Sequence, residues 1–160
     1  MTENPIADRA KELFMAGYNC SQSVFMAFAE RYGFDKEKAA ELAFSFGGGM
    51  GGQRGVCGSV SGMLMAFGMI FGKECPLGDN VAKAKHYKTI QNLCAEFKNR
   101  NGSMICADLL KGINLQKTPE QRTAGYYRKR PCPDMVHCSA KILEDYISEC
   151  NNNKDRENTK

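Results

Sequence analysis

The chain has 160 residues, a length that suits one domain and leaves little room for two. Hydrophobic residues make up 42% and charged residues 25%, so the chain can bury a core and does not have the composition of a disordered protein. The formal net charge of +4 is too small to indicate nucleic-acid or membrane binding, and we expect neither partner.

The location of the protein is predicted from its N-terminus and its cysteine content. The sequence MTENPIADRAKELF has no apolar stretch of the kind that a signal peptide carries, so we expect a cytoplasmic protein. The uncharged run at residues 56–72 is shorter than the roughly 20 residues of a membrane span and favours a buried helix. Because cytoplasmic thiols stay reduced, the eight cysteines require metal binding, redox chemistry or burial as an explanation.

Helical periodicity covers nearly the whole chain. It predicts an all-α fold, with one domain of six or seven helices at residues 1–150 and a polar, disordered tail at 151–160. Asn4 and Pro5 are expected to begin the first helix. If Gly17, Tyr18 and Asn19 interrupt this helix, Asn19 caps a second helix that opens at Cys20; Asp35 is expected to cap another that runs to about residue 45.

Glycines mark the middle of the chain. Ten of the 16 glycines lie between residues 47 and 72, and GGGMGGQRG at 47–55 predicts a tight loop near the centre of the fold. A helix is expected to follow at about residues 57–71. In it, Gly58 and Gly62 lie four residues apart, which allows close approach to a neighbouring helix.

The second half of the chain predicts four more helical segments. Asp79 is expected to cap a long helix that ends at Asn101 and Gly102, and Ser103 a short helix up to Gly112. The sequence TPEQ at residues 118–121 has the pattern of a capping box and predicts another helix start. Cys132 is expected to open the last helix.

Four of the cysteines fall at these predicted helix starts: Cys20, Cys57, Cys106 and Cys132. A helix N-terminus offers free N–H groups and a positive dipole end, which both favour the thiolate that acts as nucleophile or metal ligand. If the four starts converge, they form a four-thiolate metal site. The basic residues before Cys132 predict a pKa below the ordinary value for this thiol; they are Arg122, Arg128, Lys129 and Arg130.

The other cysteines and the histidines are weaker candidates. Free cysteine is often only a small buried hydrophobe, and we expect this of Cys94, while Cys150 should be dispensable. His86 is expected at the surface, and His137 is a lesser site candidate because it lies near Cys132 in the sequence. No C-x-x-C is present, which excludes the usual thioredoxin, zinc-knuckle and haem-attachment motifs.

The glycine loop formally contains G-x-G-x-x-G, but no strand is predicted before it, so a dinucleotide site is not indicated. Glycines can instead leave backbone N–H groups free to face an anion, either a phosphate or a sulfide-ligated cluster. On this interpretation, the candidate cofactor-binding residues are Gly49, Gly51, Gly52 and Gly58.

Four sequence blocks together resemble a known family. They are GYNCSQSV (17–24), FGGGMGGQRGVCGSVSG (46–62), GSMICADLL (102–110) and RPCPDMVHCSA (130–140), and they are similar to the signature blocks of the C-GCAxxG-C-C family of redox-active proteins. The resemblance spans about residues 7–147. It implies redox activity with an iron–sulfur or other metal centre, and it assigns the family's four cysteines to Cys20, Cys57, Cys106 and Cys132. Ser59 replaces an alanine of the family pattern.

Three functions remain open from the sequence. The first is a small electron-transfer protein whose four cysteines bind an iron–sulfur cluster, with [2Fe–2S] preferred because it takes four cysteines. The second is a metal-free thiol/disulfide oxidoreductase. The third is a helical partner-binding domain whose cysteines bind structural zinc or nothing. The sequence leaves open whether the protein is an enzyme and whether it forms a homo-oligomer. It also leaves open which redox partner protein it meets.

Overall fold

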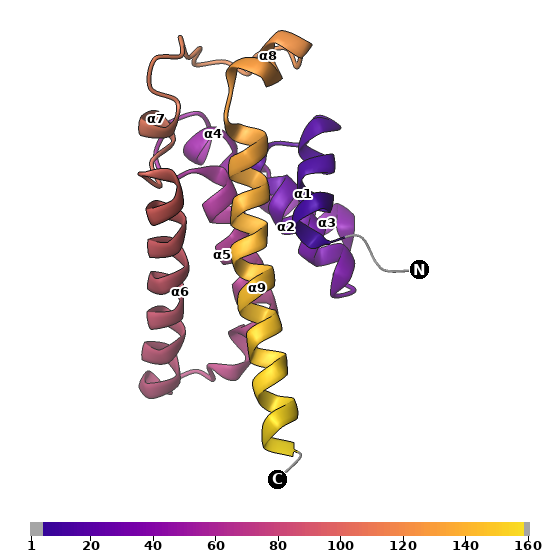
Figure 1. Cartoon of the computed structure of the whole chain (residues 1–160), viewed down its shortest axis with the longest axis vertical. Helices are drawn as coiled ribbons and strands as arrows, with labels where there is room; N and C mark the ends of the chain where they lie inside the picture. Colours follow the sequence, from indigo (N-terminus) through magenta and orange to yellow (C-terminus); the bar gives the residue numbers. More distant parts are fainter. Residues whose placement is uncertain (1–4, 159–160) are drawn as a thin grey trace.

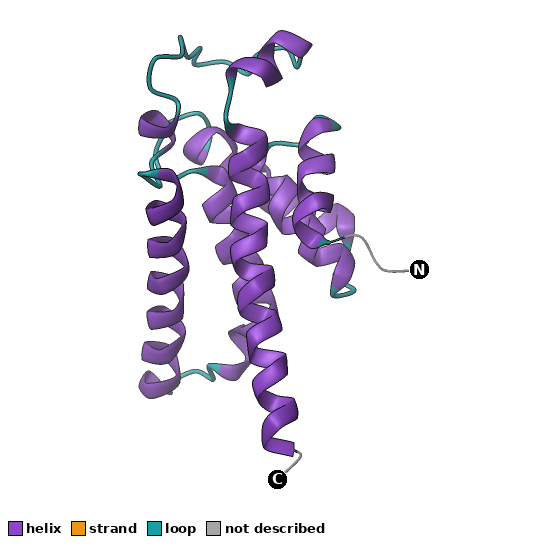
Figure 2. Cartoon of the chain, viewed as in Figure 1, coloured by secondary structure: helices purple, strands orange, loops and turns teal. Residues whose placement is uncertain are grey.

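The computed structural model describes residues 5–158 and is all-α, as predicted (Figures 1 and 2). Six helices have eight or more residues in this part of the chain, which agrees with the expected six or seven. They are α1 (Ile6–Met15), α2 (Cys20–Arg31), α3 (Lys36–Ala43), α5 (Gly58–Phe71), α6 (Asn80–Asn101) and α9 (Cys132–Asn158). The shorter helices are α4 (Gly47–Met50), α7 (Cys106–Leu109) and α8 (Ala124–Lys129).

The predicted helix caps explain where three helices begin. The Asn19 side chain accepts from the Gln22 N–H, and the Gln22 side chain accepts from the Asn19 N–H, which completes a capping box at α2. Asp35 and Asp79 cap α3 and α6 in the same way, each accepting from a backbone N–H three residues on. Pro5 precedes α1, and Asn4 lies outside the described residues.

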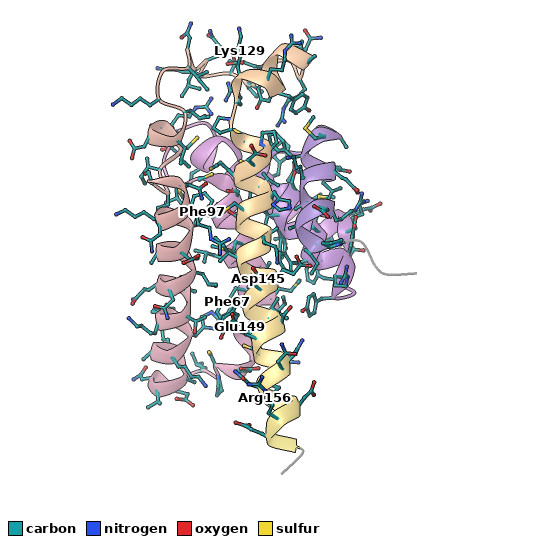
Figure 3. All side chains as sticks on the ribbon, in the orientation of Figure 1. Phe67, Phe97, Lys129, Asp145, Glu149 and Arg156 are labelled. Carbon is teal, nitrogen blue, oxygen red and sulfur yellow. The ribbon has the colours of Figure 1, made fainter. Side chains whose placement is uncertain are left out.

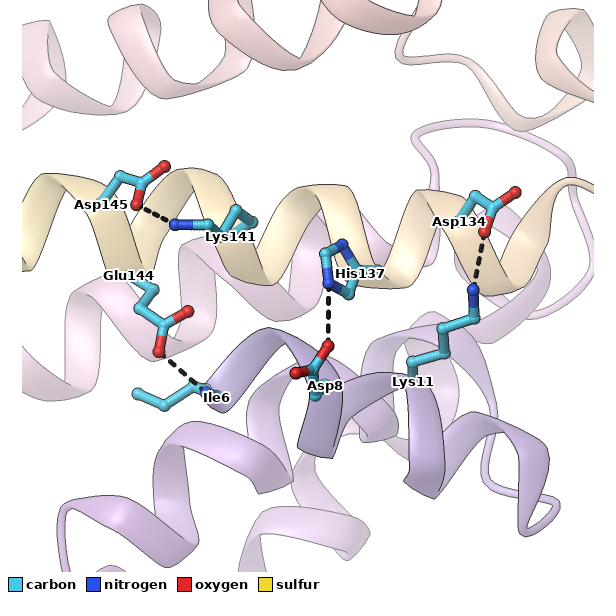
Figure 4. Close-up of polar contacts among 8 residues, drawn as sticks. All are labelled: Ile6, Asp8, Lys11, Asp134, His137, Lys141, Glu144 and Asp145. Carbon is cyan, nitrogen blue, oxygen red and sulfur yellow. Dashed lines mark hydrogen bonds and ion pairs between the residues drawn. The ribbon is translucent and has the colours of Figure 1, made fainter. Parts of the chain in front are cut away.

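Helices α2, α5 and α9 form the centre of the fold, with α1 packed on α2 and α9. An added Cβ at Gly62 of α5 would lie 2.6 Å from the Ser21 carbonyl oxygen of α2, so the predicted close approach is confirmed. Polar contacts join α1 to α9, including Lys11 to Asp134 at 2.9 Å (Figure 4). The largest fully buried side chains are apolar and include Phe14, Phe28, Met26, Met63, Phe97 and Leu143.

Two of the expected helix starts are wrong. Residues 118–121 are not helical, because Glu120 pairs with buried Arg130 at 2.9 Å and Thr123 caps α8 instead. Ser103 is not an N-cap, since its hydroxyl accepts from the Ile105 N–H in a tight turn. Ile105 is held extended by an isolated antiparallel bridge to Val56, so the short helix α7 begins only at Cys106.

The last helix begins at the predicted residue but ends later than predicted. α9 begins at Cys132 as expected and continues to Asn158, beyond residue 150 where the domain was expected to end. The side chains of residues 151–157 are exposed. Within the described residues, none of the helices combines the length and apolar character needed to cross a bilayer.

Candidate cysteine site

The four predicted site cysteines each lie at the start of a different helix. Cys20, Cys106 and Cys132 are the first residues of α2, α7 and α9, and Cys57 is the residue before α5. All four line one cavity of about 60 Å³ at the end of the molecule where α4, α7 and α8 lie (Figure 1). The structure therefore brings together four thiols that are up to 112 residues apart in sequence.

All eight cysteines are free thiols in the structure. Among residues 5–158, no three histidine, cysteine, aspartate or glutamate side chains are grouped closely enough to hold one metal ion. The four cavity thiols surround a common space, and their role as metal ligands stays a prediction.

Backbone hydrogen bonds fix two of the thiols. The Cys57 N–H donates to the Met104 carbonyl at 2.8 Å, and the Cys106 N–H donates to the Gly55 carbonyl at 2.7 Å. These bonds extend the bridge between Val56 and Ile105. The segments before α5 and before α7 are thus locked side by side, which holds Cys57 and Cys106 at the same cavity.

The glycine segment packs tightly around the thiols. An added Cβ at Gly58 would overlap the Cys20 sulfur and lie 2.9 Å from the Phe46 carbonyl oxygen. An added Cβ at Gly49 would lie 2.8 Å from Cys106 Cβ, and Gly49 has φ +67°, which favours glycine. Both positions require glycine because the chain approaches a cysteine side chain too closely for any other residue.

The four candidate glycines are not equivalent. Gly49 and Gly58 pack against cysteine side chains, whereas Gly51 and Gly52 face the Ser45 and Lys117 carbonyl oxygens, and none of the four is among the residues that line the cavity. Gly48 does line it, and a hydrogen bond from its backbone lowers the pKa of Cys20. Sequence reasoning missed Gly48 because a row of glycines does not show which N–H turns inward.

Burial raises the pKa of three of the cavity thiols, Cys20, Cys57 and Cys132. Burial and the neighbouring Cys20 raise the pKa of Cys57 to about 11, against a hydrogen bond from Ser59 that lowers it. Burial and Cys57 likewise raise the pKa of Cys132 to about 11, although Arg130 and Arg122 act in the opposite direction. The predicted low pKa of Cys132 is therefore wrong, because burial and the other thiols outweigh the basic residues. Burial also raises the pKa of Cys20.

Three arginines line the cavity, and two of them come from the predicted basic cluster. Arg130 is only 8% exposed and lies over the Tyr126 ring at 4.5 Å. Arg54 Nη1 lies 3.9 Å from the Cys106 sulfur. The other members of the cluster, Arg128 and Lys129, are exposed.

Arg122 has an unusual environment. Its guanidinium lies over the rings of Phe14 at 4.5 Å and Tyr126 at 4.8 Å, and Nη2 donates to the Tyr18 carbonyl at 3.4 Å. Its other terminal nitrogen, Nη1, is buried and has no hydrogen-bond partner in the structure. A buried cationic N–H without an acceptor is costly, so this nitrogen is a candidate to contact a hydrogen-bond acceptor beside the cavity.

Two buried serines extend the site toward α9. The Ser139 hydroxyl donates to the Ser59 oxygen at 2.9 Å, and the Ser59 hydroxyl lies 3.2 Å from the Cys57 sulfur. Both serines are fully buried. With Ser139 donating to Ser59, the Ser59 proton is free to point at Cys57, where it lowers the pKa of that thiol.

The family model described as "Putative redox-active protein (C_GCAxxG_C_C)" matches residues 18–146 of this chain. The chain belongs to this family. It is also similar to an uncharacterised protein of Archaeoglobus fulgidus, with 29% identity over 122 residues, which cover 71% of this chain and 80% of that protein. No solved structure matches the chain.

The cysteines outside the family's four do not line the cavity. Cys94 packs half-buried against the core, as expected. Cys75 donates to the Ala82 carbonyl, Cys138 contacts Asn101, and Cys150 hydrogen-bonds the Tyr146 hydroxyl. Cys75 precedes α6, and the other three lie on α6 or α9, away from the cavity.

Neither histidine belongs to the site. His86 was expected at the surface, but it is half-buried and packs against Phe67 in a tilted arrangement with a ring-centroid distance of 4.5 Å. His137 lies 3.2 Å from Asp8 in the contact between α9 and α1 (Figure 4). The proximity of His137 to Cys132 in sequence does not bring it to the cavity, because its side chain leaves the helix on another face.

Proposed function

We propose that this member of the C-GCAxxG-C-C family is a small electron-transfer protein in which Cys20, Cys57, Cys106 and Cys132 hold an iron–sulfur cluster, most simply [2Fe–2S]. The observation that carries the proposal is one cavity lined by four thiols together with three guanidinium groups. Four cysteines are the ligand set of such clusters.

The charges around the cavity support this assignment. The three arginines, less the carboxylate of Glu120 that pairs with Arg130, give a net charge of +2. Protonated thiols cannot neutralise it. Two Fe³⁺ ions, two sulfides and four thiolates have a summed charge of −2, which balances the protein's groups. The orphaned Arg122 Nη1 would then have an anionic partner.

The arrangement of the thiols supports a cluster over a single zinc ion, because no three ligating side chains among residues 5–158 are grouped closely enough to hold one ion. A tetrahedral zinc site draws its sulfurs to about 2.3 Å from one ion. Here four thiols line a shared cavity of about 60 Å³. A cluster with several metal ions and bridging sulfides occupies more space than one ion and suits this arrangement.

When bound, the cluster supplies reversible one-electron transfer. The chain's own residues prepare the site for it. Arg54, Arg122 and Arg130 stabilise negative charge, and apolar Phe14 and Met135 limit the access of water. Loading releases protons from the cysteines, so assembly is favoured by a rise in pH.

The thiol/disulfide oxidoreductase is the second candidate, and the serine hydroxyl at Cys57 favours it because it stabilises a thiolate. However, a thiol with a pKa of about 11 is almost fully protonated at neutral pH and is a poor nucleophile. We therefore rank it below the cluster. With either function, a cytoplasmic location suits eight free thiols.

The test is metal and sulfide analysis after anaerobic purification. Wild-type protein should contain iron and acid-labile sulfide in equal amounts, and each of the four variants Cys20→Ser, Cys57→Ser, Cys106→Ser and Cys132→Ser should lose most of both. Cys150→Ser is the matched control and should keep them. Zinc without sulfide, or iron retained in all four variants, would contradict the proposal.

A further inference from the structure

The positive charge of the chain is concentrated in the connection between α7 and α9, residues 110–131, which we name the basic segment. It contains six basic residues and one acidic residue, a net charge of +5, whereas the rest of the chain has a net charge of −1. Four of the six are exposed: Lys111, Lys117, Arg128 and Lys129. Within the described residues these four form no ion pair, unlike Lys11, Lys38 and Lys141 elsewhere on the surface.

The basic segment covers the cysteine cavity. Its Arg122, Tyr126 and Arg130 line the cavity from that side. Arg54 Nη2 donates to the Gln116 carbonyl at 3.0 Å, and this bond joins the basic segment to the glycine turn at residues 47–55. Figures 1 and 3 show α8 and Lys129 at the same end of the molecule as α4 and α7. The inner side of the basic segment thus faces the thiols, and its outer side presents unpaired cations to solvent.

Exposed apolar side chains lie beside this layer. Phe44 is 67% exposed, and its carbonyl accepts from the side chain of Asn19, which itself lines the cavity. Met50 is 46% exposed and belongs to the glycine turn, in which an added Cβ at Gly52 would lie 3.4 Å from the Lys117 carbonyl oxygen. Protein interfaces combine an apolar centre with a polar or charged rim, and this end of the molecule offers both.

We infer that the basic segment, with Phe44 and Met50, is the docking surface for a small acidic electron-transfer protein. The inference deepens the proposed function, because docking there places the partner over a segment that lines the redox site. In the exchange, the reduced centre loses one electron and the partner's oxidised centre gains it, and no bond or proton is transferred. Charge complementarity raises the rate of such encounters by about 10-fold to 1000-fold at low salt.

The test uses two one-electron oxidants of opposite charge, hexacyanoferrate(III) and hexaammineruthenium(III), mixed with the reduced, anaerobically purified protein. The rate of oxidation is followed as a function of salt concentration. The test variant replaces Lys111, Lys117, Arg128 and Lys129 by Glu, and a second variant replaces them by Gln in case the charge reversal disturbs folding. The control replaces Lys85 and Lys88, exposed on α6, by Glu.

For the wild-type protein and the control, the anionic oxidant should react faster at low salt than at high salt. In the Glu variant that advantage should fall by about tenfold, and the cationic oxidant should gain. Equal rates and salt slopes in all proteins would overturn the docking surface. Tight binding of a 30-base-pair DNA duplex at 150 mM salt would overturn it too, in favour of a nucleic-acid interface. Iron and sulfide content separately reports whether the cluster proposal holds.

Discussion

The substitution Gly58→Ala tests the close packing of the glycine segment on the cysteines. The new Cβ would overlap the Cys20 sulfur and lie 2.9 Å from the Phe46 carbonyl oxygen and 3.3 Å from the Ser21 backbone nitrogen. Two of these three atoms belong to the backbone, so they cannot turn away as the end of a flexible side chain can. Such overpacking costs about 1–3 kcal/mol, and it exceeds the gain of at most roughly 1 kcal/mol that alanine brings to a helix.

Gly68→Ala on the same helix is the matched control, because nothing lies within 4 Å of its added Cβ and its φ is normal. Thermal unfolding of the metal-free, reduced proteins should show a loss of about 2–6 °C for Gly58→Ala and no loss, or a gain, for Gly68→Ala. The Gly58 variant should also lose iron, since Cys20 must move. Equal melting temperatures for the two variants would refute the reasoning.

Three further predictions follow from the site's charges and hydroxyls. Arg122→Gln should lower the reduction potential of the centre by about 50 mV, roughly 1 kcal/mol for one electron, in a redox titration. The exposed control Arg128→Gln should leave the potential unchanged. An unchanged potential in the Arg122 variant would show that this guanidinium does not stabilise charge at the site. Burial raises the pKa of Cys57 in the folded state to about 11, so the free energy of unfolding of the metal-free protein should hold below about pH 8.5 and fall as the pH rises to 11. Urea unfolding should show a smaller fall for Cys57→Ala. Equal pH profiles for the two proteins would contradict the raised pKa. Ser59→Ala should lower the free energy of unfolding by about 1–2 kcal/mol, because it leaves the buried Ser139 hydroxyl without its acceptor. The double variant Ser59→Ala/Ser139→Ala should recover part of this loss. If the losses of the two single variants simply add in the double variant, the two hydroxyls do not interact.

Local signals in the sequence were sufficient for most of the fold. Asn19, Asp35 and Asp79 cap the helices that they were expected to cap, because an N-cap depends on atoms only three residues away. The two expectations that failed involve long-range competition. Residues 118–121 stay non-helical where Glu120 pairs with Arg130, and Ile105 is held extended by Val56. Contacts of this kind are not visible in a local pattern.

In the candidate site, too, local features could be predicted from the sequence and long-range contacts could not. The positions of the four cysteines at helix starts could be predicted, and the cavity that they share agrees with that prediction. The raised pKa of Cys132 could not, since it depends on burial and on Cys57 and Cys106, which the fold brings close to it. The inward turn of Gly48 and the aromatic surroundings of Arg122 likewise arise only when α1, the glycine turn and the basic segment meet.

Native mass spectrometry of the anaerobically purified chain tests the central claim most directly, because it counts the atoms that the cavity holds. The cluster proposal predicts one dominant species whose mass exceeds that of the chain by two irons and two sulfides, less the protons lost from the four cysteines, and this species should be absent in Cys57→Ser. A chain that carries one zinc ion, or a metal-free chain that gains and loses two hydrogens with oxidant and reductant, would contradict it.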